Sequence, residues 1–156
     1  MSDTTTAPAA ADAATQAALE RLNTVIDRLI APDGCPWDST QTPESLTEYV
    51  IEECHELVDA IRSGKTADMV EELGDVAFLI LMIGKLMARA GGPSLADALE
   101  VEAAKMVRRH PHVFSDTTYE NQSEQLKDWD RIKREEKAAA DAEGPKGTYD
   151  SLPRGL

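Results

Sequence analysis

Four acidic side chains in two short stretches have the clearest capacity for chemistry. One stretch reads E-E-C-H-E and the other E-E-L-G-D. Residues three apart share one face of a helix, so Glu53 pairs with Glu56, and Glu72 pairs with Asp75. Carboxylate oxygens are hard ligands that suit Mg²⁺, and also Mn²⁺ or Ca²⁺. We therefore expect a divalent-cation site, with Mg²⁺ as the favoured ion and Mn²⁺ as an alternative.

The two acidic pairs are placed symmetrically about Gly64. Glu56 lies eight residues before this glycine, and Glu72 lies eight residues after it. Glu53 lies eleven residues before it, and Asp75 lies eleven residues after it. In an antiparallel helix pair that turns at Gly64, both pairs stand roughly 12–16 Å from the turn. Four converging carboxylates repel one another unless a cation binds, so the spacing favours a metal site.

Two other interpretations compete with this one. A single acidic residue on a helix usually just coats a solvated face, but the mirrored set of four, flanked by apolar residues, favours the metal. Gly74 supports it, because glycine inside a helix costs about 1 kcal/mol relative to alanine and marks close packing or ligand approach. Glu52 and His55 form an E-x-x-H motif of the di-iron type, which needs a second copy. Neither His110 nor His112 has an acidic residue three positions earlier.

The elements that must position these side chains are predicted to be helices. Apolar spacing and Gly/Pro breaks predict helices over about 16–30, 43–63, 67–90, 95–109 and 123–140. We expect an all-α bundle of about four to five helices in one domain over 16–140, with flexible tails at 1–15 and 141–156. The second half of the third helix is apolar nearly all round, which predicts a core completed by oligomerisation.

Charge and composition exclude several classes of protein. The formal net charge of −13 disfavours nucleic acid and anionic membranes as partners. The longest apolar run, 76–83, is too short to span a bilayer. No leader peptide is recognisable, and Cys35 and Cys54 form no C-x-x-C pair. We expect a cytoplasmic protein in a reducing compartment.

A phosphate substrate would need cationic partners, and the chain has one dense basic cluster. Lys105 and Arg108, three residues apart, are able to face one phosphate, although basic residues at a helix end also complement the helix dipole. The cluster comprises Lys105, Arg108, Arg109, His110 and His112.

Trp37 lies in the loop before the second helix, where it would either stack on a base or sugar or pin the loop to the core.

Five motifs follow one another along the chain. They are G-C-P-W-D at 34–38 with Gln41-Thr42, E-E-x-x-E at 52–56, E-x-x-D at 72–75, R-R-H-P-H-V-F at 108–114, and W-x-x-I-K-x-x-E-K at 129–137. In this order they resemble the MazG nucleoside triphosphate pyrophosphohydrolases. The resemblance covers roughly residues 20–137, and each motif alone is weak, whereas the ordered set is specific.

The resemblance implies an all-α enzyme that uses Mg²⁺ and assembles as a homodimer or a dimer of dimers. Members hydrolyse NTPs and dNTPs between the α- and β-phosphates and release the monophosphate and pyrophosphate. Lys105 and the arginines that follow it match positions near the phosphates, and Trp37 matches a loop near the nucleotide. The metal ligands of the family match Glu53, Glu56, Glu72 and Asp75.

This chain departs from the family pattern at three positions, which affects the expected substrate preference. Pro43 and Ile83 stand where many relatives have histidine, and Leu79 stands where many have glutamine. We assign Glu52, beside the predicted ligands, the role of orienting or deprotonating the attacking water. Two alternatives remain open: a non-catalytic acidic oligomeric adaptor with a structural metal, and an all-α pyrophosphatase specific for dUTP.

Overall fold

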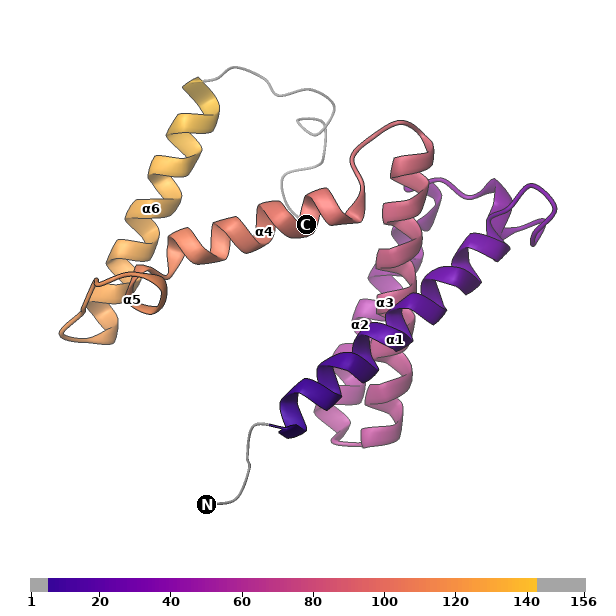
Figure 1. The fold of residues 1–156 in the computed structure, drawn as a ribbon, viewed down its shortest axis with the longest axis horizontal. Helices are drawn as coiled ribbons and strands as arrows, with labels where there is room; N and C mark the ends of the chain where they lie inside the picture. The colour runs from indigo at the N-terminus through magenta and orange to yellow at the C-terminus, as the bar shows by residue number, and fades with distance from the viewer. Residues whose placement is uncertain (1–5, 143–156) are drawn as a thin grey trace. The chain divides into compact units, whose positions relative to one another are not determined.

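The computed structural model describes residues 6–142 (Figure 1), which contain α-helices and short 3₁₀ helices and no strand. The all-α prediction is confirmed, and each of the five predicted helices is present. The structure adds a one-turn helix, α5, and the two 3₁₀ helices. The elements are α1 (Thr6–Leu29), η1 (Asp38–Thr40), η2 (Glu44–Leu46), α2 (Thr47–Ser63), α3 (Thr66–Arg89), α4 (Leu95–Arg109), α5 (Pro111–Phe114) and α6 (Gln122–Ala142).

The first helix differs most from its predicted bounds. It begins at Thr6, whereas the sequence predicted a flexible tail up to residue 15 and a helix from about Gln16. The segment is rich in alanine, the residue with the highest helix propensity, so it extends the helix without any apolar periodicity. Residues 6–15 are therefore helical. Residues 1–5, and the part of the predicted C-terminal tail beyond 142, lie outside the described residues.

The described residues divide into two compact units. The first unit comprises residues 6–98 and the second comprises residues 99–142, so that the boundary falls inside α4. Each unit is described separately below. None of the helices in the described range is both long and apolar enough to cross a membrane.

An antiparallel hairpin of α2 and α3 dominates the first unit, and α1 packs across α3 (Figure 1). Gly64 ends α2 in the left-handed conformation, with φ of 70°, as a C-terminal glycine does. The tight turn between Ser63 and Thr66 brings α3 back along α2. The buried core lies mainly between α1 and the second half of α3: Ile26, Ile30, Leu46, Leu79, Leu81, Met82 and Leu86.

The connection from α1 to α2 folds back closely on the end of α1. Gly34 donates its N–H to the carbonyl of Ala31 at 2.8 Å, and Cys35 donates to the carbonyl of Leu29 at 2.9 Å. A Cβ atom on Gly34 would lie only 2.3 Å from the Leu29 oxygen. Only glycine allows the backbone to approach so closely, so this residue fixes the start of the loop that carries Trp37.

Polar contacts hold the second unit together. All buried hydrophobic side chains among the described residues belong to the first unit. In the second unit, α4 is tied to α6 by ion pairs from Arg108 and Arg109 to Glu136. His110 packs edge-on against Trp129, with ring centroids 4.8 Å apart. The helices of this unit thus keep apolar side chains exposed, including Val113, Phe114 and Leu126.

Candidate metal and nucleotide site

Three of the four predicted ligands come together on the facing sides of α2 and α3. Glu53, Glu56 and Glu72 each offer a carboxylate oxygen, and these oxygens lie within 4.8 Å of one another. The left-handed turn at Gly64 places the two helices in register, as the symmetric spacing predicted. Glu53 and Glu72 are half-buried, while Glu56 is exposed. The arrangement is an open cluster of hard oxygen donors that fits a divalent cation.

Asp75 lies outside this group of three but belongs to the same electrostatic cluster. It follows Glu72 by three residues on α3 and is exposed. Its negative charge acts on the pKa of both Glu53 and Glu72. The structure thus brings all four predicted carboxylates to one region of the α2–α3 hairpin, three of them at ligand distance and Asp75 beside them.

The surroundings of Glu53 and Glu72 disfavour the charged form of both carboxyl groups. Burial raises the pKa of Glu53, and the charges of Asp75, Glu56 and Glu52 raise it further. Burial likewise raises the pKa of Glu72, and the charge of Glu56 is the largest of the like-charge effects on it. Both shifts have the sign expected when carboxylates crowd together without a counter-charge. A bound cation would supply that counter-charge.

Two further sequence expectations concern residues beside the cluster. Glu52 is exposed on α2, and its charge contributes to the raised pKa of Glu53. Its predicted role toward water stays a prediction. A Cβ atom on Gly74 would meet no atom within 4 Å, so the close packing expected at this glycine does not occur within residues 6–142.

Trp37 does not enter the core. Its side chain is 48% exposed, and its ring meets Tyr49 edge-on, with centroids 5.5 Å apart. Tyr49 lies in the first turn of α2, four residues before Glu53, so the two share one face of the helix. This contact attaches the loop to the part of α2 that leads to the carboxylates and leaves one side of the indole open.

The predicted phosphate-binding residues lie on α4 within the second unit, and all three have acidic partners. Lys105 forms an ion pair with Glu102 on the same helix. Arg108 donates from Nε to Glu136 at 3.0 Å, and Arg109 donates from Nε and a terminal nitrogen at 2.9 and 2.7 Å. Arg108 remains 56% exposed, whereas Arg109 is only 17% exposed.

Sequence reasoning missed the role of Glu136. Hydrogen bonds from Arg109 lower the pKa of this carboxyl most strongly, and those from Arg108 lower it further. One carboxylate thus joins two consecutive arginines of α4 to α6. Glu136 stands in the last of the five motifs, but spacing alone does not reveal a contact with arginines 27 and 28 residues away.

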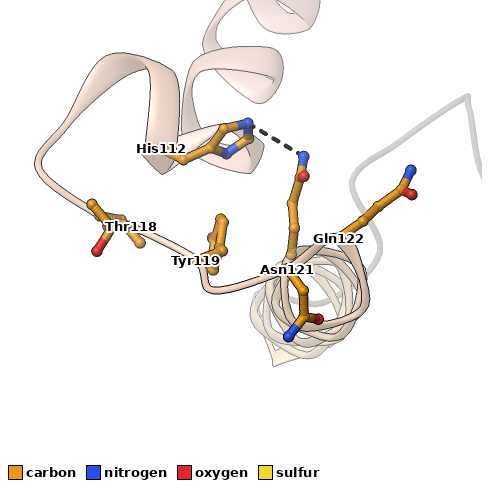
Figure 2. A pocket seen from close by; sticks show the side chains of 7 residues that line it. His112, Thr118, Tyr119, Asn121 and Gln122 are labelled. Carbon is orange, nitrogen blue, oxygen red and sulfur yellow. Dashed lines mark hydrogen bonds between the residues drawn. The ribbon is translucent and has the colours of Figure 1, made fainter.

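A polar hollow in the second unit also escaped prediction (Figure 2). The Nε2 atom of His112 lies 3.2 Å from the amide nitrogen of Gln125. The other ring nitrogen, Nδ1, is buried and has no hydrogen-bond partner among the described residues. The hollow is lined by His112, Thr117, Thr118, Tyr119, Asn121, Gln122 and Gln125.

Two positions that depart from the family pattern belong to the core of this chain. Leu79 is buried, and Ile83 packs against the buried cluster. Both lie on α3, C-terminal to the carboxylates. In this chain they extend the apolar interior of the first unit.

Cys35 and Cys54 are both free thiols.

Comparisons with known proteins show which sequences this chain resembles. Residues 41–114 match the MazG nucleotide pyrophosphohydrolase domain. A nucleoside triphosphate pyrophosphohydrolase of Escherichia coli K12 is 37% identical over 139 residues, which are 88% of this chain and 52% of that protein. The nucleoside triphosphate pyrophosphohydrolase/pyrophosphatase MazG of Thermotoga maritima is 39% identical over 118 residues, which are 76% of this chain and 45% of that protein.

One further sequence relative and one solved structure also resemble this chain. YabN, an uncharacterized protein of Bacillus subtilis, is 40% identical over 132 residues, which are 85% of this chain and 26% of that protein. The chain therefore spans about half the length, or less, of these relatives. A crystal structure of a MazG-related protein from Thermotoga maritima superposes with a TM-score of 0.63 at 29% identity, covering 74% of this chain and 98% of that one.

Proposed function

Since the chain belongs to the MazG family, we propose that it hydrolyses nucleoside triphosphates between the α- and β-phosphates in a reaction that requires Mg²⁺. The products are a nucleoside monophosphate and pyrophosphate, and the substrates include both NTPs and dNTPs. The observation that carries the proposal is the cluster of Glu53, Glu56 and Glu72 with oxygens within 4.8 Å of one another. A triphosphate is a polyanion, and it approaches such a cluster only when a cation lies between them.

The metal would be held by the three clustered glutamates and Asp75. When bound, it supplies positive charge that neutralises the phosphates and the charge that develops in the transition state. Glu52 accepts a proton from the water whose oxygen bonds to phosphorus. The bond from that phosphorus to the oxygen bridging the α- and β-phosphates then breaks, and pyrophosphate leaves.

The basic residues of α4 are proposed to bind the phosphates. Arg108 supports this role best, because it is 56% exposed and uses only Nε toward Glu136. Its terminal nitrogens make no hydrogen bond within the described part of the chain. Arg109 is oriented by two hydrogen bonds to Glu136, and Lys105 exchanges its partner Glu102 for a phosphate oxygen.

We also propose that the protein acts as a homodimer or a dimer of dimers. On α3, Val70, Leu73 and Ile80 are exposed at spacings that place them on one face of the helix. Exposed apolar surface of this kind is typical of an interface between subunits. Light scattering coupled to size-exclusion chromatography measures the mass directly, and a monomer at micromolar concentration contradicts the proposal.

Pyrophosphate release from a panel of NTPs and dNTPs, with Mg²⁺ and with EDTA, tests the activity. We expect turnover with Mg²⁺, none with EDTA, and partial recovery with Mn²⁺. Turnover of dUTP alone would identify the single-nucleotide pyrophosphatase. If no nucleotide of the panel releases pyrophosphate but titration with Mg²⁺ releases heat, the protein is the adaptor with a structural metal instead.

A further inference from the structure

Two consecutive arginines at the end of α4 reach the same carboxylate, although helix geometry separates them. Neighbouring residues of a helix are rotated by about 100° about its axis, so their side chains leave in different directions. Two guanidinium groups also repel each other, because arginine stays charged in proteins. Arg108 and Arg109 would therefore diverge unless an acidic group held them together.

Glu136 of α6 is that acidic group. Its Oε1 accepts a hydrogen bond from Nε of Arg108 at 3.0 Å, and its Oε2 accepts two from Arg109 at 2.9 and 2.7 Å. The Glu136 side chain is only 22% exposed, so little water competes for these charge-assisted hydrogen bonds. One negative charge thus lies between two positive ones, and the group of three as a whole stays cationic.

The two arginines are held to different extents. Arg109 is buried against α6, and its guanidinium carbon lies 5.6 Å from the centroid of the Trp129 ring. Trp129 is supported in turn by His110, whose ring meets it edge-on. Arg108 is more exposed and uses Nε alone, so both terminal nitrogens of its planar fork lack a partner within the described part of the chain. Arg109 is the anchored member of the pair, and Arg108 is the one able to reach an anion.

We propose that Glu136 is a positioning residue, which holds the Arg108 guanidinium so that its free fork is presented to the leaving pyrophosphate. The proposal rests on the proposed function, because it takes the pyrophosphate part of the triphosphate as the anion. A guanidinium fork matches two oxygens of a phosphate group. Fixing Nε beforehand removes side-chain freedom that binding would otherwise have to restrict. Glu136 itself touches no substrate atom.

Charge alone predicts the opposite of what positioning predicts. Removal of the negative charge of Glu136 makes the surroundings of both arginines more positive, which by itself strengthens the binding of a polyanion. If Glu136 positions Arg108, the same change weakens binding instead. The sign of the change therefore separates a positioning role from a general electrostatic one.

The first test measures the binding of pyrophosphate directly. Isothermal titration calorimetry in the presence of Mg²⁺ gives the Kd for pyrophosphate in wild type, Glu136→Gln and Glu135→Gln. We expect Kd to rise about tenfold in Glu136→Gln, the lower end of the range for losing a hydrogen bond between charged groups. Glu135→Gln is the matched control, because it removes the same charge from a residue that pairs with Arg131 on α6 itself. Its Kd should stay within about twofold of wild type.

The second test is a double-mutant cycle that shows whether Glu136 acts through Arg108. Arg108→Ala removes the proposed contact with pyrophosphate and should raise Kd about tenfold or more. When Glu136→Gln is added to Arg108→Ala, we expect less than about a twofold further rise, because no guanidinium is left to position. A merely structural role of Glu136 would weaken binding by the same factor in both backgrounds. Circular dichroism checks that each variant keeps its helices.

The outcomes separate this proposal from the proposed function. Wild-type protein that turns over no nucleotide refutes the function, whereas the calorimetry still measures what Glu136 does for pyrophosphate. Wild-type turnover combined with an unchanged or lower Kd in Glu136→Gln overturns the positioning role alone. Equal rises in Glu136→Gln and Glu135→Gln overturn it as well, and so do effects that multiply in the double variant. Wild-type protein that binds no pyrophosphate also contradicts it.

Discussion

Carboxylates in the two units of the molecule lie in opposite electrostatic surroundings. In the first unit, Glu53 and Glu72 lie beside other acids, and burial together with like charge raises the pKa of both. In the second unit, Glu136 accepts hydrogen bonds from two arginines, which lower its pKa. Because Glu136 is paired with two arginines, its charge stabilises the second unit. The mutual repulsion of Glu53 and Glu72 with their acidic neighbours opposes the folded state, and the proposed cation would relieve it, as expected of a binding site.

The largest effect should come from removing one charge of the crowded cluster. Glu53→Gln deletes a proposed ligand, and turnover should fall roughly a thousandfold, since metal charge stabilisation contributes several kcal/mol to the transition state. The helical circular-dichroism signal should remain, because the substitution relieves repulsion. Asp75→Asn should behave in the same way. Wild-type rates of pyrophosphate release in either variant would remove that residue from the ligand set.

The next largest effect is the dependence of stability on Mg²⁺ and pH. The raised pKa of Glu53 and Glu72 means that their repulsion is absent below their ordinary value of 4.5 and grows as pH rises through the folded-state values. Without metal, the cluster should therefore destabilise the fold progressively above about pH 4.5. At a hundredfold excess over its Kd, Mg²⁺ should raise Tm by roughly 5–10 °C near neutral pH and by much less near pH 4.

Glu53→Gln provides the control for this measurement, and its Tm should respond weakly to Mg²⁺ at every pH. Differential scanning fluorimetry with and without EDTA is sufficient. A shift in wild type that is equal at pH 4 and pH 7 would contradict a carboxylate site. The pH dependence of stability at Glu136 runs the other way. Because its pKa is lowered, Glu136 stabilises the fold above pH 4.5, and this stabilisation is lost as pH falls further.

A smaller effect is expected from breaking the paired carboxylate. Glu136→Ala leaves Arg109, which is only 17% exposed, without its charged partner. The free energy of unfolding should fall by about 1–2 kcal/mol, and Tm by a few degrees. Glu135→Ala is the matched control, because Glu135 pairs with Arg131 on the same exposed helix surface and should change Tm by about 1 °C or less. Equal effects would mean that the Glu136 pair contributes no more than a surface ion pair.

The sequence predicted the helices well because they are marked by local features. Leu95–Arg109 was predicted with the bounds observed, since Ser94 caps it and Pro111 stops it. The second helix was predicted from Pro43, but the chain first forms η2 and enters α2 at Thr47. The Thr42 hydroxyl caps this segment by accepting the N–H of Ser45. The Ala-rich start of α1 was missed because it has propensity without periodicity.

The carboxylate cluster was predictable because a hairpin converts sequence spacing into position. The contacts of Glu136 and Arg89 were not, because each joins elements connected by long stretches of chain. Arg89 reaches carbonyls 48 to 59 residues away, and backbone acceptors leave no trace in the sequence. The same holds for the contact between Trp37 and Tyr49, which depends on the path of the intervening loop.

The turn at Gly64 has a consequence for how this protein tolerates change. One residue inserted between Ser63 and Thr66 would rotate α3 by about 100° relative to α2 and advance it by about 1.5 Å. Glu72 would then leave the side of α3 that faces Glu53, although every side chain in the cluster would still be present. The length of this two-residue connection thus fixes the rotation of α3 relative to α2, and it matters as much for the site as the acidic side chains themselves.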